Sequence, residues 1–106
     1  MTTTPSPQYL KLKGQYPGFL DTVEALGKAA RQAGPLDEKS AQLIQLAAAA
    51  AIRSEGAVHS HAARALDAGA GAAEVYHAII LLTSTIGFPT VVAALSWAAD
   101  VVDKNE

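Results

Sequence analysis

The sequence predicts an all-α fold, and three observations support that prediction. Half of the 106 residues are apolar but only 6% are aromatic, with alanine the dominant apolar residue. Alanine has the highest helix propensity, and its small side chain lets neighbouring helices approach closely. Glycine and proline divide the chain into segments, and apolar residues recur in those segments with helical spacing. We therefore expect a six-helix bundle without strands.

The first two helices are expected in the N-terminal third of the chain. Residues 1–7 are rich in Thr, Pro and Ser, and they are expected to be a flexible lead to one domain over residues 8–106. A short helix around residues 9–13 ends before Gly14. A longer helix around residues 18–32 follows, because its apolar residues lie close to the i, i+3, i+4, i+7 pattern of an amphipathic helix.

The third and fourth helices are expected to form the centre of the fold. Asp37 is a suitable N-cap for a helix over residues 38–53, whose second half is apolar on all sides, as in a helix buried by several neighbours. This segment is shorter than the roughly 20 apolar residues that cross a bilayer. Gly56 is expected to separate it from a fourth helix over residues 57–68, which ends at Gly69.

Two further helices complete the predicted fold. A strongly apolar helix is expected over residues 72–86, with the Glu74 carboxylate capping its N-terminus. The Gly-Phe-Pro sequence at residues 87–89 breaks it, and proline opens a last helix that reaches Val102.

Composition argues against several classes of function. Eight basic and ten acidic residues give a net charge of −2, so we expect neither a nucleic-acid partner nor a membrane partner. The chain has no cysteine, which excludes a disulfide, a thiolate nucleophile and a thiolate metal site. The N-terminal residues lack the charged and apolar regions of a signal peptide, so a cytoplasmic location is expected.

His61, Ala65 and Gly69 follow one another at a four-residue step. This spacing resembles the H-x-x-x-A-x-x-x-G signature of the carboxymuconolactone decarboxylase and AhpD-like family. The resemblance extends from about residue 36 to residue 102. Its other elements are Leu36-Asp37-x-Lys39, Leu43-Ile44, Glu74-Val75 and Gly87-Phe88-Pro89.

The resemblance also shows which reactive residues this chain lacks. The peroxidase branch of the family carries a C-x-x-C pair upstream of the histidine, and Ser54 and Ala57 stand at those two places. A glutamate of the peroxidase proton relay is replaced by Gln42, which leaves only His61 of the relay. The decarboxylase branch tends to carry a glutamate where this chain has Ala57. The resemblance therefore implies the family's scaffold without its redox cysteines.

His61 is the candidate catalytic residue, because an imidazole can transfer protons near neutral pH or hydrogen-bond a ligand. The leading hypothesis is a pocket around His61 for a small organic molecule, lined by Gln42, Ser54, Ala57 and Ser60. The alternative is that His61 is a packing residue in a non-catalytic structural or interaction module. Whether the chain is an enzyme stays open, no cofactor is expected, and the resemblance implies a homo-oligomer, either a trimer or a hexamer.

A histidine metal site is a further alternative. His59, His61 and His77 are weak candidate ligands for zinc, copper or iron. Residues two apart on a helix point in roughly opposite directions, so His59 and His61 are poor partners for one metal. The spacing matches no standard metal motif, and no metal is expected.

Overall fold

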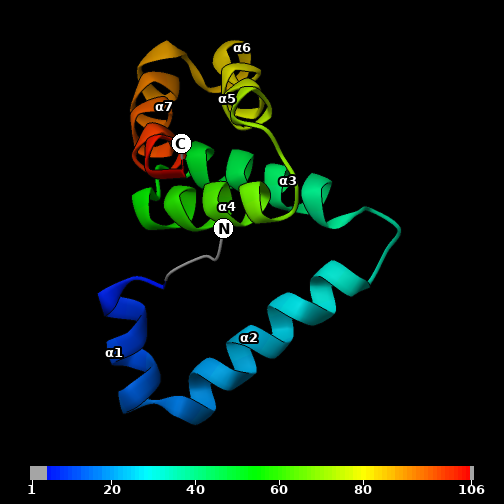
Figure 1. The fold of residues 1–106 in the computed structure, drawn as a ribbon, viewed down its shortest axis with the longest axis vertical. Coiled ribbons are helices and arrows are strands. Elements are labelled where there is room, and N and C mark those ends of the chain that lie inside the picture. The colour runs from blue at the N-terminus through cyan, green and yellow to red at the C-terminus, as the bar shows by residue number, and fades with distance from the viewer. Residues whose placement is uncertain (1–4, 106) are drawn as a thin grey trace. The chain divides into compact units, whose positions relative to one another are not determined.

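The computed structural model describes residues 5–105, and all of the regular structure in that range is helical (Figure 1). Six α-helices have nine residues or more, which confirms the all-α, six-helix prediction. A single-turn helix and a 3-10 turn complete the described structure. In chain order the elements are α1 (Pro7–Gln15), α2 (Pro17–Gln32), α3 (Glu38–Ala51), α4 (Glu55–Asp67), α5 (Ala72–Ile80), α6 (Thr83–Ile86), α7 (Phe88–Val102) and the 3-10 turn Asp103–Asn105.

The helices form two compact units, α1 with α2 and α3 through α7. In the first unit, Ser6 caps α1, because its hydroxyl oxygen accepts a hydrogen bond from the Tyr9 backbone N–H at 3.1 Å. An ion pair of 3.1 Å between Lys13 and Glu24 links α1 to α2. Residues 1–4 of the expected flexible lead lie outside the described range, and Pro7 already belongs to α1.

The second unit has a core made largely of small side chains. α3 packs against α4 and α5, and α7 packs against the same two helices. Because alanine fills many of the contact positions, the helix backbones can lie close together. The buried core residues are Leu46, Ala49, Ala50, Val58, Ala62, Ala65, Ala70, Val75, Ile79, Val91, Ala94, Ala98 and Val102.

The connection between α3 and α4 lies earlier than the sequence predicted. Arg53 adopts a left-handed conformation with φ of 57°. Its N–H donates to the Ala50 carbonyl at 3.1 Å, and the Ser54 N–H donates to the Ala49 carbonyl at 3.0 Å. This is the Schellman pattern, in which a left-handed residue ends a helix. The predicted break at Gly56 is therefore wrong, since Gly56 lies inside α4 and the turn is made at Arg53.

The helix predicted over residues 72–86 is interrupted at Leu81 and Leu82, which separate α5 from α6. The Thr83 hydroxyl donates to the Ile80 carbonyl at 2.7 Å, and such a side-chain bond competes with the helical backbone bond. The predicted cap is confirmed, because the Glu74 carboxylate accepts a hydrogen bond from the Gly71 N–H at 3.0 Å. Within residues 5–105, no helix is long and apolar enough to cross a membrane.

Candidate functional site

Three polar side chains form a hydrogen-bonded chain from α3 to α4. The Gln42 side-chain N–H donates to the Glu38 carboxylate at 2.8 Å, and the Gln42 carbonyl oxygen lies 2.8 Å from His61 Nδ1. Gln42 is 1% exposed and is the only buried polar or charged side chain in the described part of the molecule. A buried amide is costly unless both of its ends find partners, and here both ends do.

The chain of hydrogen bonds determines which nitrogen of His61 carries the proton in the neutral ring. The Gln42 amide group must present its N–H to the Glu38 carboxylate, so its oxygen faces His61. That oxygen can only accept, and His61 Nδ1 must therefore be the donor. In this tautomer the lone pair lies on Nε2, which makes Nε2 the basic atom of the ring.

Helix geometry explains how these side chains meet. Glu38 and Gln42 are four residues apart on α3, so their side chains lie on the same face. His61 lies in the middle of α4, which packs closely against α3. The imidazole is thus held by a rigid helix pair rather than by a loop, an arrangement that favours a fixed orientation.

The structure gives the other predicted site residues different positions. Ser54 is the N-cap of α4, and its hydroxyl accepts a hydrogen bond from the Ala57 N–H at 3.4 Å. Ala57 is partly buried and packs against the core of the second unit. Ser60 is partly buried on α4 and is not part of the Glu38–Gln42–His61 chain. Within the predicted set, Gln42 and His61 are joined by a hydrogen bond between their side chains, whereas the Ser54–Ala57 bond is a helix cap.

The three histidines contact three different environments. His59 Nε2 lies 3.0 Å from a carboxylate oxygen of Asp100 on α7, whereas His61 contacts Gln42. His77 lines an apolar groove. Among the described residues, the histidines do not form a joint group of potential metal ligands with one another.

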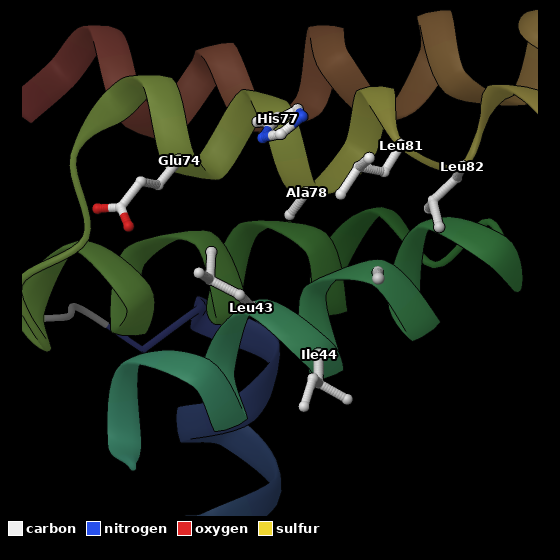
Figure 2. A pocket seen from close by; sticks show the side chains of 8 residues that line it. Leu43, Ile44, Glu74, His77, Ala78, Leu81 and Leu82 are labelled. Atoms are coloured by element: carbon white, nitrogen blue, oxygen red, sulfur yellow. The ribbon is translucent and has the colours of Figure 1, made fainter. Parts of the chain in front are cut away.

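The groove at His77 has a volume of about 370 Å³ and lies between α3 and α5 (Figure 2). Figure 2 shows Leu43 and Ile44 on one side, with the residues of α5 and the segment after it opposite. His61 does not line this groove. The lining residues are Leu43, Ile44, Ala47, Glu74, His77, Ala78, Leu81 and Leu82.

Glu74 is the acidic residue that lines one end of the groove. The hydrogen bond from the Gly71 backbone N–H lowers the pKa of the Glu74 carboxyl, and the bonded Lys39 ammonium lowers it further. The Lys39 and Glu74 side chains form an ion pair of 3.1 Å. Both features favour the ionised carboxylate, so the groove is lined mainly by apolar side chains and has the Lys39–Glu74 ion pair at one end.

Sequence reasoning missed the role of Glu38. Glu38 was not among the expected site residues, yet its carboxylate accepts the hydrogen bond of the amide that orients His61. The sequence contained a signal for the contact between Glu38 and Gln42, because residues four apart on a helix lie on the same face. The partner of His59 gave no comparable signal, since Asp100 lies 41 residues further along the chain.

Comparisons with known proteins agree with this architecture. The sequence model of the carboxymuconolactone decarboxylase family matches residues 17–100. A crystal structure of the apo form of a carboxymuconolactone decarboxylase family protein from Legionella pneumophila has the same fold, with a TM-score of 0.78 at 24% sequence identity. That likeness covers 92% of this chain and 86% of the Legionella chain.

A curated relative adds a partial match. An uncharacterized protein from Haemophilus influenzae is 44% identical over 55 residues, which are 52% of this chain. The match spans about half, 49%, of the length of the Haemophilus protein.

Proposed function

Because the chain belongs to the carboxymuconolactone decarboxylase family, we propose that it binds a small organic molecule and transfers a proton to or from it at His61. The proposal rests on one observation above all: the buried Gln42 amide fixes the imidazole, and the Glu38 carboxylate fixes the amide. The chain has no cysteine, so the proposed chemistry is not that of a thiol peroxidase.

The arrangement suits general acid–base catalysis. A catalytic base needs a defined tautomer and a third group that orients it. Gln42 orients His61 in this way. Glu38 accepts the Gln42 N–H bond and so stabilises the amide orientation in which the oxygen faces His61. When Nε2 takes up a proton, the positive ring keeps its Nδ1–H bond to the Gln42 oxygen.

The name of the family indicates decarboxylation, a reaction in which an imidazole can act as the proton donor. In the decarboxylation of a carboxylated lactone, the bond between carbon and the carboxylate breaks and carbon dioxide leaves. The electron pair stays on carbon, and that carbon must then receive a proton. We assign the donation of that proton to the protonated Nε2 of His61. Nε2 then takes up a new proton from solvent.

The test is turnover by the wild-type protein and by His61→Ala. Small carboxylated lactones and related carbon acids are followed by NMR in deuterated water, where decarboxylation and deuterium incorporation are both visible. Removing a general acid–base residue costs about 10²–10⁴-fold in rate, so we expect kcat to fall by that factor. Circular dichroism must show that the variant stays folded.

His77→Ala is the matched control, because His77 lies in the separate apolar groove and its removal should leave turnover unchanged. Equal rates for wild type and His61→Ala would contradict the assignment of His61. No turnover or ligand binding with any compound, combined with a loss of stability in His61→Ala of about 1–3 kcal/mol, would favour the packing role instead.

We also propose that the chain assembles into a homo-oligomer, a trimer or a hexamer. Several large apolar side chains of the second unit are exposed in the single chain, and a small monomer rarely leaves so many uncovered. Light scattering at micromolar concentration should report at least three copies of the 10.9 kDa chain. A monomer at that concentration would refute the assembly. These exposed side chains are Ile44, Ile52, Ile80, Leu81, Phe88 and Val92.

A further inference from the structure

We propose that Glu55, His59 and Asp100 form a binding site for a divalent first-row transition-metal cation, with Zn²⁺ as the reference ion. The site joins α4 to α7 and is separate from the His61 site. Each residue offers one ligand atom, and the three atoms lie within 4.8 Å of one another. It is the only group of three or more histidine and acidic side chains with this geometry among the residues that the structure describes.

The distances suit a metal that binds on one side of the imidazole. Zinc binds histidine nitrogen and carboxylate oxygen at roughly 2.0–2.2 Å in a tetrahedral site, which places neighbouring ligand atoms about 3.3–3.6 Å apart. His59 Nε2 lies 3.0 Å from the Asp100 oxygen and 4.0 Å from the Glu55 oxygen. The Asp100 pair is thus a few tenths of an ångström closer than ligand spacing, and the Glu55 pair is a few tenths wider. The Glu55 side chain is 58% exposed, so a small rotation can bring its oxygen closer.

Charge balance also favours a divalent cation. The Glu55 and Asp100 carboxylates converge on the same imidazole nitrogen, and two like charges this close repel each other. A neutral His59 has one hydrogen to donate and can satisfy only one of them. A divalent cation binds both carboxylates and the neutral imidazole at once, and it neutralises the two negative charges. Imidazole with carboxylate ligands suits zinc and its neighbours in the first transition row.

The helices hold the ligands in place while leaving room for the ion. Glu55 and His59 are four residues apart at the start of α4, so they share one face. Asp100 comes from α7, which packs against α4 through buried residues of both helices. The His59 side chain is 34% exposed, so an ion can approach from solvent and keep water in its remaining positions.

His59 and His61 contact different helices, so the two sites are separate. His61 lies two residues beyond His59 on α4 and contacts Gln42 of α3 rather than Asp100. Metal bound at His59 is therefore expected to tie α4 to α7 without occupying the imidazole of the proposed reaction.

The experiment is a zinc titration of the full chain, purified without a polyhistidine tag and stripped with a chelator. Isothermal calorimetry should show one Zn²⁺ per chain, and the melting temperature should rise with Zn²⁺ because the folded form alone holds the site together. His59→Ala and Asp100→Asn should each weaken binding at least tenfold, since loss even of a group that only supports a ligand costs about 10–100-fold. Glu55→Gln should weaken it less, because that oxygen starts further away.

His77→Ala and His61→Ala are the matched controls, and both should bind Zn²⁺ as the wild type does. In the wild type, NMR should also show that Zn²⁺ shifts the ring nitrogens of His59. The absence of saturable binding, or unchanged binding by His59→Ala, would overturn the proposal. Loss of binding in His77→Ala or His61→Ala with His59→Ala unaffected would place the metal elsewhere and equally refute this site.

Discussion

A variant that carries Ser54→Cys and Ala57→Cys is expected to form a reversible disulfide across the first turn of α4. Ser54 is the N-cap, and its hydroxyl already lies 3.4 Å from the Ala57 N–H. Helix positions three apart have Cβ atoms about 5–6 Å apart, whereas a disulfide requires roughly 3.5–4.5 Å. The non-helical backbone of the N-cap can supply this small approach. Loss of the serine cap should cost about 1 kcal/mol.

Mass spectrometry after mild oxidation should show the loss of two hydrogens, and a thiol reductant should reverse it. The single variants Ser54→Cys and Ala57→Cys are the controls, because neither can close an internal bond. If the folded double variant does not close the disulfide, the correspondence of Ser54 and Ala57 to the cysteine pair is wrong.

Addition of Gln42→Glu to this variant should produce hydroperoxide reduction, which the cysteine-free parent cannot perform. The new carboxyl lies at hydrogen-bond distance from the Glu38 carboxylate, so the two groups are expected to share one proton. The helix N-terminus favours the thiolate at position 54. That thiolate attacks the peroxide oxygen, releases an alcohol and becomes a sulfenic acid, which the second thiol converts to the disulfide with loss of water. A dithiol donor then reduces the disulfide. The parent protein in the same assay is the control, and its rate should equal that of buffer.

Leu46→Ala is expected to lower the free energy of unfolding by about 2–5 kcal/mol. Leu46 is 0% exposed and lies in the core among residues of which many are alanine. Alanine neighbours have no side-chain atoms that can move into the space left by leucine, so the cavity should persist. Urea denaturation followed by circular dichroism measures the loss.

Ile44→Ala is the matched control for this prediction, because Ile44 lies on the same helix but is 54% exposed. It should cost under about 1 kcal/mol in the single chain. Any larger cost should depend on protein concentration, since it would arise from the proposed assembly. Equal costs for both variants at every concentration would contradict the core assignment of Leu46.

The number and approximate positions of the six longer helices were predicted from the sequence because their signals are local. Proline and glycine marked the ends of several helices, and the Glu74 cap was visible as a carboxylate near a helix start. The α3–α4 turn could not be located in this way. Glycine is the usual left-handed residue at a helix end, so Gly56 was the natural expectation, whereas Arg53 adopts that conformation here.

The same distinction between local and long-range signals applies to the candidate site. His61 and Gln42 were identified through a family pattern that is local in sequence, and the structure joins them. Ser54 was placed in the same pocket, but its observed bond is a cap within its own helix. Asp100 was not identified as a partner of His59, because that contact depends on the packing of α4 against α7.

The short turn at Arg53 and Ser54 has a consequence for the order of folding. It joins two helices that pack against each other, so α3 and α4 meet after the closure of a very short loop. Closing a short loop has a small entropic cost, and contacts close in sequence form fastest. We expect the α3–α4 hairpin to be structured in the transition state and α7 to dock afterwards. Changes in the hairpin should then mainly slow folding, whereas changes in α7 should mainly speed unfolding.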